Sequence, residues 1–197
     1  MKKRTKFLLF GLIPFSIFIF FVATGYHYIP VDTTIGKCIM DYTSPSTYAS
    51  RPSPLMSHGF EVNGQEVLVC YGSPSAKERK VFGSMVRFDR LWRTGANEPT
   101  RLYTTTDMVL GEVVVPKGRY SIYTIPREGE WEIFISKSTY HWGNVITKGV
   151  REQEIGSFVV ETLPTAGFVE SFTIRSENEK LVMEWENTRV EIPVVGI

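Results

Sequence analysis

The segment "HGFEVNGQEVLVCYG", residues 58–72, decides the fold class. Asn63 and Gly64 lie between two stretches of strand-forming residues, and this dipeptide is a strong hairpin signal because a type I′ turn needs positive φ at both central positions. Beyond the turn, the run "VLVCY" (residues 67–71) is apolar on both of its alternating faces, which is typical of an interior strand. The segment therefore predicts an antiparallel hairpin whose second strand lies inside a sheet.

The chain that follows shows one strand signal after another. The runs are short, rich in β-branched and aromatic residues, and separated by turn residues: "TRLYTTT", "MVLGEVVVP", "GRYSIYTIP", "EWEIFISK", "GSFVVETL", "ESFTIRS", "KLVMEWE" and "RVEIPVV". After residue 25 we find no helical stripe of ten or more residues. About eight or nine short strands with regularly spaced turns predict an all-β fold, an antiparallel β-sandwich of immunoglobulin-like or jelly-roll-like kind.

The N-terminus has the pattern of a membrane anchor. Residues 1–6, "MKKRTK", are basic, and the run from Phe7 to Thr24 carries no charge. At about 1.5 Å per residue such a helix is roughly 27 Å long, enough to cross a hydrocarbon core. We therefore predict a transmembrane signal anchor over residues 7–25, with residues 1–6 cytoplasmic and the C-terminal domain extracytoplasmic, in the periplasm or at the cell surface. A cleaved signal peptide is the alternative, although Val22-Ala23-Thr24 is a poor cleavage site.

The rest of the chain divides into a linker and a domain. Residues 26–57 are rich in Pro, Ser and Thr and show no helical or strand period, so we predict a spacer there and a β-sandwich domain over residues 58–197. In an oxidising compartment Cys38 and Cys70 could form a disulfide that ties the linker to the domain. The alternative is that Cys70 is a buried small apolar residue within its strand.

Charge is distributed unevenly along a chain whose formal net charge is only +1. Between residues 77 and 93 there are six basic residues and two acidic ones, whereas residues 152–191 hold nine Glu and three basic residues. This asymmetry has two interpretations. Either one end of the fold favours anions, or the two segments face and neutralise each other.

The longest connection predicted between strands, "GSPSAKERKVFGSMVRFDRLWRTGANE", is the first candidate site. At about 27 residues it is too long for a simple turn and too apolar to be disordered, which is typical of a functional loop or a packed lid. We take six of its residues as candidate ligand-binding groups: Lys77, Arg79, Trp92, Arg93, Asn97 and Glu98. The basic side chains would bind an anion, the amide and carboxyl groups would recognise a hydroxyl or amine, and the indole would offer a stacking face.

The alternative for this loop is internal bracing. Arg93 would pair with Glu98, Asn97 would cap the turn through its own backbone, and Gly95 would supply a positive φ. The sequence leaves both interpretations open.

A second aromatic loop, "STYHWGN" (residues 138–144), holds His141 beside Trp142. His141 is a candidate general base or a neighbour of a stacked sugar, although an isolated loop histidine is seldom catalytic. The sequence contains no G-x-S-x-G, S-x-x-K, H-E-x-x-H, P-loop or G-x-G-x-x-G motif, and its three histidines predict no zinc site. We expect no cofactor, and nothing in the pattern favours nucleic-acid binding.

Several segments resemble one known family. They are "YGSPSAKERKVFGSMVRFDRLWRTGANEPT", "PKGRYSIYTIP", "EWEIFISK", "HWG" and "LVMEWENTRVEIPV", which together with their surroundings cover roughly residues 51–195. They are similar to the domain of unknown function 2911, a bacterial envelope family whose members usually carry an export signal. The resemblance implies location and fold but no established activity.

The chain departs from the usual pattern of that family inside the candidate loop. Where members tend to have Arg-Pro-Ser followed by Lys-Gly-Arg, this chain has Ser-Pro-Ser at residues 73–75 and Lys-Glu-Arg at residues 77–79. The Pro-Tyr-Gly of the family is replaced by Arg-Phe-Asp at residues 87–89. These changes alter the charge of the loop and therefore bear on any anion site there.

Three functions fit these observations. The first is a binding or interaction module, tethered to the bilayer through residues 7–25, for a polar or anionic envelope ligand. The second is an envelope hydrolase or lyase with Glu98 or His141 as acid or base, oriented by Arg93 and Asn97. The third is a structural partner in an envelope complex, which would expose an apolar patch of several hundred Å².

Overall fold

The computed structural model describes residues 51–139 and 141–197, together with Cys38. The chain separates into two units, Met1–Arg51 and Pro52–Ile197, and the strands that the structure describes belong to the second. This unit begins before residue 58, so the end of the predicted linker already belongs to the first strand. The predicted anchor over residues 7–25 lies outside the described residues. Within the described ones, no helix has the length and hydropathy needed to cross a bilayer.

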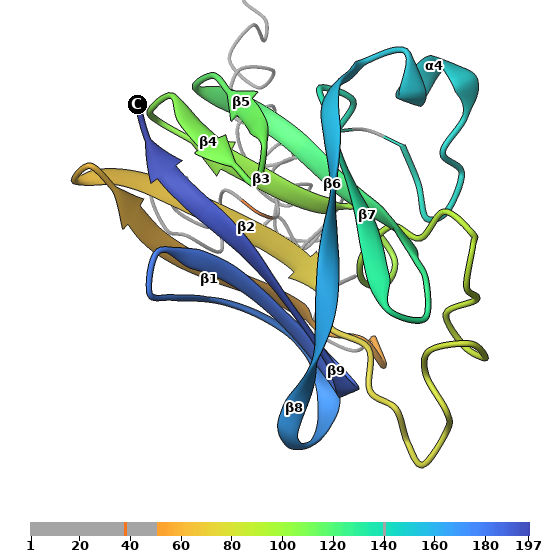
Figure 1. The fold of residues 1–197 in the computed structure, drawn as a ribbon. Coiled ribbons are helices and arrows are strands. Elements are labelled where there is room, and N and C mark those ends of the chain that lie inside the picture. The colour runs from red at the N-terminus through yellow and green to blue at the C-terminus, as the bar shows by residue number, and fades with distance from the viewer. Residues whose placement is uncertain (1–37, 39–50, 140) are drawn as a thin grey trace, which may run out of the picture. The chain divides into compact units, whose positions relative to one another are not determined.

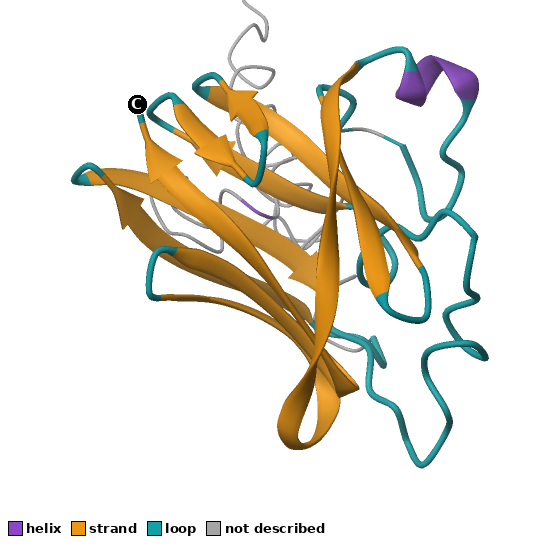
Figure 2. Ribbon diagram, in the orientation of Figure 1, coloured by secondary structure: helices purple, strands orange, loops and turns teal. Residues whose placement is uncertain are grey.

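The fold is all-β, as the sequence predicts. An open antiparallel sheet of nine strands has the order β1-β2-β3-β6-β7-β8-β9-β4-β5 (Figure 1). Its strands are β1 (Leu55–Val62), β2 (Gln65–Gly72), β3 (Thr100–Thr104), β4 (Met108–Leu110), β5 (Val113–Val115), β6 (Gly118–Pro126), β7 (Glu130–Ser136), β8 (Glu154–Glu177) and β9 (Lys180–Gly196). Helix α4 (Lys148–Arg151) is a single turn within the connection between β7 and β8 (Figure 2).

The hairpin predicted from "VNGQ" is confirmed. Val62 pairs with Gln65 across the two-residue turn, and Asn63 and Gly64 have φ of 52° and 71°. The second strand is interior, as its double apolar pattern indicates, because β2 lies between β1 and β3 and its residues 67–72 are buried.

The C-terminal third forms fewer and longer strands than the sequence predicts. "GSFVVETL" and "ESFTIRS" belong to one strand, β8, and "KLVMEWE" and "RVEIPVV" belong to β9. The register of β8 shifts twice between Pro164 and Thr173, so the chain bends there without reversing. The first part of β8 pairs with β7 and the second part with β9, which brings two parts of one sheet to face each other.

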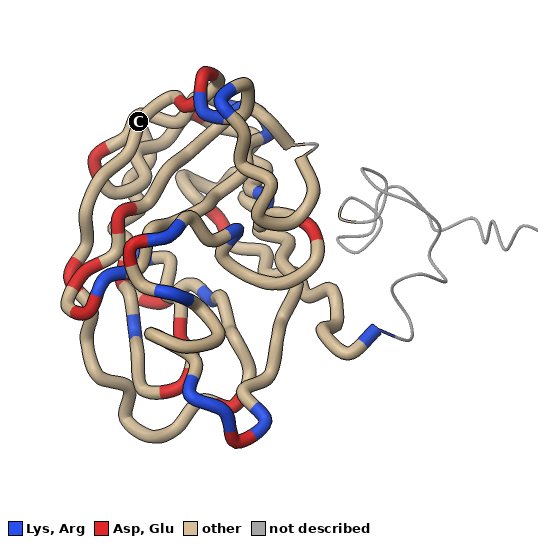
Figure 3. Tube along the Cα trace, turned by 90° about the vertical axis from the view of Figure 1, so that its right-hand side faces the viewer, with Lys and Arg blue, Asp and Glu red and all other residues tan. Residues whose placement is uncertain are grey.

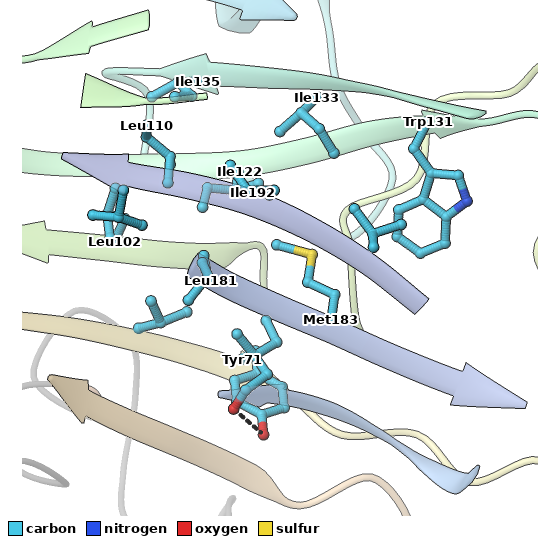
Figure 4. Packing of buried hydrophobic residues seen from close by; sticks show 14 of the residues in the cluster. Tyr71, Leu102, Leu110, Ile122, Trp131, Ile133, Ile135, Leu181, Met183 and Ile192 are labelled. Carbon is cyan, nitrogen blue, oxygen red and sulfur yellow. Dashed lines mark hydrogen bonds between the residues drawn. The ribbon is translucent and has the colours of Figure 1, made fainter. Parts of the chain in front are cut away.

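The core lies between these two parts of the sheet. Figure 4 shows Ile122 and Ile133 of β6 and β7 near Leu181, Met183 and Ile192 of β9, and all five side chains are fully buried. At one end an aromatic group completes the core with edge-to-face and stacked rings. Its members are Phe82, Trp92, Trp131, Phe172 and Trp185.

A short β-bridge at Ser75 and Ser171 and several side-chain hydrogen bonds, rather than a continuous strand ladder, join the outer edge of the sheet to the second part of β8. We call this junction the seam. The Ser73 hydroxyl donates to the Phe172 carbonyl at 2.7 Å, and the Ser176 N–H donates to Nε2 of His58 at 2.8 Å. The seam therefore closes the core at discrete points, and among the described residues the outward main-chain groups of β1 form no backbone hydrogen bond across it.

Candidate functional site

The connection between β2 and β3, residues 73–99, forms a lid over one end of the core, and we call it the lid loop. Val81, Phe82, Val86 and Trp92 are buried in the main hydrophobic cluster. Phe88 and Leu91 are half-buried and Met85 is exposed, so the apolar residues of the loop are buried only in part. Apolar burial without regular secondary structure explains how such a long loop stays ordered.

The last residues of the lid loop leave the sheet and return to it within a short distance. Trp92 forms a β-bridge with Thr124 through two 2.8 Å hydrogen bonds, and Thr100 then pairs with Ile122. Residues 93–99 thus connect two positions that are only two residues apart on β6. They must bulge outward, and this bulge carries Arg93, Asn97 and Glu98 of the predicted site.

Close backbone contact holds the bulge against the end of β2. The Ala96 N–H donates to the Gly72 carbonyl at 3.1 Å. A Cβ at Gly72 would lie 2.0 Å from the Ala96 carbonyl oxygen, so a side chain cannot fit there. Gly95 has a φ of 151°, which supplies the positive φ that the bracing interpretation expected.

The structure brings the two predicted loops together. The Arg93 N–H donates to Oδ1 of Asn144 at 3.1 Å, and a Cβ at Gly143 would lie 3.4 Å from Nη1 of Arg93. Gly143 has a φ of 57°, a conformation that glycine adopts without strain. The backbone at Gly143 therefore lies directly beside the guanidinium. We call the combination of Arg93, Asn97, Trp142 and Gly143 the Arg93 site.

Arg93 has an unusual environment for a surface cation. Its side chain is half-buried, and its Nε is buried without a hydrogen-bond partner in the part of the chain that the structure describes. Burial lowers the pKa of Arg93, and the negative charge of Glu98 partly opposes this shift. The guanidinium remains charged, so the site holds a partly desolvated cation.

The neighbours predicted in the same motif have different positions. Trp92 is 5% exposed and donates from Nε1 to the Gly95 carbonyl, so its ring belongs to the core and offers no stacking face. Glu98 is 1% exposed. Asn97 is half-buried with a φ of 63°, and its amide donates to the Ser53 carbonyl at 3.3 Å rather than capping its own turn.

In the second loop His141 and Trp142 point to different environments. His141 is 8% exposed, its ring meets that of Tyr123 edge-on, and burial lowers its pKa. Trp142 is 58% exposed. Of the two candidate indoles, Trp142 is therefore the exposed one and Trp92 the buried one.

Lys77 and Arg79 lie in a different part of the lid loop. The Lys77 N–H donates to Glu170 at 2.8 Å, and Arg79 donates from Nε to the Ala76 carbonyl at 2.9 Å. Glu186 accepts hydrogen bonds from the N–H groups of Val81 and Phe82. Acidic residues of β8 and β9 therefore bind the basic loop through its backbone, and no hydrogen bond or ion pair within the described residues joins Lys77 or Arg79 to the Arg93 site.

The charges on this side of the molecule are mixed. Figure 3 shows basic and acidic segments interspersed rather than gathered into one basic patch. Arg175 and Arg189 of the acidic segment are held by Glu177 and Glu184 in the same segment. The contacts that join the two segments use the N–H groups of the basic loop rather than its cationic side chains.

Arg101 and Ser121 are polar residues that the sequence analysis missed. They face each other on β3 and β6, and both are fully buried. Within the described residues Oγ of Ser121 has no hydrogen-bond partner. One sequence signal could have identified Arg101. It is a charged residue inside "TRLYTTT", a segment with strong β propensity, and it directly precedes the core residue Leu102.

Two further observations limit the chemistry. Among the described residues no cluster of three His, Cys, Asp or Glu could hold a metal ion. Cys38 and Cys70 are fully buried and disulfide-bonded, so the chain has no free thiol.

These features define a class of protein, an all-β domain with a half-buried cation where two loops meet. The chain belongs to the family described as protein of unknown function DUF2911, whose model matches residues 53–194. No curated protein and no solved structure matches the chain.

Proposed function

We propose that this protein is a membrane-anchored, extracytoplasmic binding module whose Arg93 site takes a polar ligand with an anionic group. The N-terminal sequence supports the location: basic residues 1–6 precede the uncharged run that we assign as an anchor over residues 7–25. The disulfide-bonded state of the cysteines agrees with an oxidising compartment. The bend of β8 supports a two-layered sandwich related to immunoglobulin-like or jelly-roll folds.

The observation that carries the proposal is the state of the Arg93 side chain. A guanidinium has five N–H donors, and a buried donor without a partner destabilises the fold. Arg93 has a buried Nε with no partner within the described residues. A carboxylate or phosphate group at the exposed part of this guanidinium would accept a charge-assisted hydrogen bond and would balance the desolvated charge.

Trp142 indicates what the rest of the ligand is like. Its exposed indole directly precedes Gly143, which lies against Nη1 of Arg93. An exposed indole beside a cation fits a ligand with an acidic group on a flat or sugar-like body. An acidic sugar of the envelope has this combination.

The test is ligand-dependent stabilisation of the full-length chain in detergent. We expect glucuronate and inorganic phosphate to raise the thermal midpoint, and glucose to leave it unchanged, because only ligands that bind the folded state stabilise it. Arg93→Gln should abolish the shift. Arg90→Gln is the matched control, since Arg90 is exposed in the same loop.

Two results would overturn the proposal. One is the absence of any stabilisation by either anion. The other is an equal stabilisation of the wild type and Arg93→Gln, which would place the anion elsewhere on the protein.

A second candidate function, a hydrolase or lyase, has one observation in its favour. The lowered pKa of His141 keeps its imidazole neutral at neutral pH, the form that can accept a proton. Glu98 fits this role less well, because a carboxyl group that is 1% exposed cannot readily reach a substrate. Mass spectrometry of the bound ligand after incubation distinguishes the two functions: an enzyme yields product that His141→Asn does not, whereas a binding module returns the ligand unchanged.

A further inference from the structure

A cleft of about 420 Å³ lies where the β1–β2 turn, the β8–β9 turn and the end of β9 come together. These three elements are at the left of Figure 1, whereas the lid loop and helix α4 are at the right. The walls of the cleft are rigid. Both turns have two central residues with positive φ, and Gly196 passes so close to Asn63 that a Cβ there would lie 2.3 Å from its amide nitrogen.

One side of the cleft is the unpaired edge of β1. Val62 and Gln65 flank a two-residue turn and therefore form a hydrogen-bonded pair. Because such pairs alternate along an antiparallel ladder, the N–H and C=O groups of Val62, Phe60 and His58 point toward β2. Those of Ser57, Gly59 and Glu61 point away from the sheet. Within the described residues these outward groups make no backbone hydrogen bond.

The opposite side of the cleft is the edge of β8, which cannot satisfy these groups. Along the seam, main-chain groups of β8 already have partners: the Phe172 N–H donates to the Pro74 carbonyl, and the Ser176 N–H donates to His58. Beyond Ser176 the two edges separate, and the cleft occupies the gap between them. An incoming strand would have donors and acceptors of β1 to pair with and an enclosed space for its side chains.

The charges around the cleft indicate which charge a partner should carry. Glu61 and Glu179 line it and form no ion pair within the described residues. Glu61 also lies directly opposite Glu66 on β2, an arrangement of like charges that disfavours the sheet on its own. Lys180 in the same lining is already held by Glu191 at 2.6 Å. The unbalanced charge is therefore negative.

The cleft also offers apolar surface. Phe60 in its lining is half-buried, and Val195 is more than half exposed although it lies in a strand. Since successive side chains of a strand point to opposite faces, a bound strand places one set of residues toward Phe60 and the other beside Glu61.

We propose that the free edge of β1 and the adjoining cleft bind an extended segment of a partner protein by strand addition. The segment alternates basic and apolar residues. Its main chain pairs with Ser57, Gly59 and Glu61, its basic side chains lie beside Glu61 and Glu179, and its apolar side chains enter the cleft beside Phe60. This site is independent of the Arg93 site and does not rest on the function proposed above.

Three fluorescent heptapeptides test this with the full-length chain in detergent, with binding measured by fluorescence anisotropy. The first alternates Lys and Val, the second alternates Glu and Val, and the third is the Lys–Val peptide N-methylated on alternate residues. We expect only the first to bind, because the second has the wrong charge and the third cannot form the main-chain ladder. Binding should weaken at high salt.

Two variants locate the site. Gly59→Pro removes an outward N–H without breaking the β1–β2 ladder, since proline is tolerated on an edge strand, and we expect it to weaken binding about tenfold. Glu61→Gln should weaken binding several-fold, whereas Glu128→Gln, an exposed glutamate in the β6–β7 turn, should not. Circular dichroism and the thermal midpoint check that each variant is folded.

The proposal fails if the N-methylated peptide binds as well as the first one, because the contact is then electrostatic only. It fails also if folded Gly59→Pro and Glu61→Gln both bind like the wild type. A concentration-dependent dimer that Gly59→Pro abolishes would assign the edge to a second copy of this chain instead. If Gly59→Pro does not fold, binding of the N-methylated peptide and binding to Glu61→Gln still test the proposal.

Discussion

Replacing Trp92 tests whether this residue of the predicted site belongs to the core. Its indole is 5% exposed and contacts four aromatic rings, with centroid distances of 6.1 Å to Phe82, 5.6 Å to Trp131, 5.3 Å to Phe172 and 6.1 Å to Trp185. A surface binding residue would have one exposed face. We therefore expect Trp92→Ala to act on stability.

The magnitude follows from what the side chain contributes. Truncating a buried Trp to Ala costs about 3–5 kcal/mol, because apolar contacts are lost and a cavity remains. The Nε1 hydrogen bond to the Gly95 carbonyl contributes about 1 kcal/mol of that loss. We expect Trp92→Ala to lower the free energy of unfolding by about 4 kcal/mol. Trp92→Phe keeps a ring but removes the donor, and we expect a loss of about 1–2 kcal/mol.

The assay is urea unfolding of the full-length chain in detergent, followed by far-ultraviolet circular dichroism so that the lost fluorophore does not affect the signal. Trp142→Ala is the matched control, because it removes the same side chain from a position that is 58% exposed. We expect it to change the free energy of unfolding by less than about 0.5 kcal/mol. A loss below about 1.5 kcal/mol for Trp92→Ala, or equal losses for the two variants, would refute the core assignment.

Three further outcomes follow from the structure. Gly111→Ala should cost about 2–4 kcal/mol in urea unfolding, since Gly111 has a φ of 61° and a Cβ there would lie 2.3 Å from the Phe158 ring, whereas Gly129→Ala, with nothing nearby, should be almost neutral. Reductant should lower the free energy of unfolding by about 2–4 kcal/mol in the wild type and by much less in Cys70→Ser. Burial lowers the pKa of His58 below 6.5, so the folded state binds a proton more weakly than the unfolded state. Stability should therefore fall as the pH drops from about 7 to 5, and urea unfolding of His58→Asn should show a smaller drop.

The local parts of the fold could be predicted because they depend on neighbouring residues. The Asn63-Gly64 turn needs only two residues that accept positive φ, and the interior position of β2 follows from an apolar pattern on both faces. The length and burial of the lid loop were also predictable, since its apolar residues had to leave water.

The long-range features depend on which residues of different strands pair with each other, and this pairing cannot be inferred from a single sequence. Nothing in "ETLPTAGFVES" distinguishes a bend from a reversal, so β8 was predicted as two strands. The contact between Arg93 and Asn144 joins residues 51 positions apart. Arg101 and Ser121 become a pair only when the register of β3 and β6 is known.

The sequence also left open whether the Trp92–Glu98 segment braces the fold or binds a ligand, and in the structure the bracing residues are not the one that we propose for binding. Trp92, Thr94 and Glu98 are buried, and the Thr94 hydroxyl bonds to that of Thr124 on β6. Arg93, between two of them, keeps its guanidinium half-exposed beside Gly143. A long flexible side chain loses entropy when it binds, and less of it when the backbone and the neighbouring loop already hold it in place. The buried residues of the motif therefore make Arg93 a better binding residue, so evidence for bracing at Trp92 does not count against binding at Arg93.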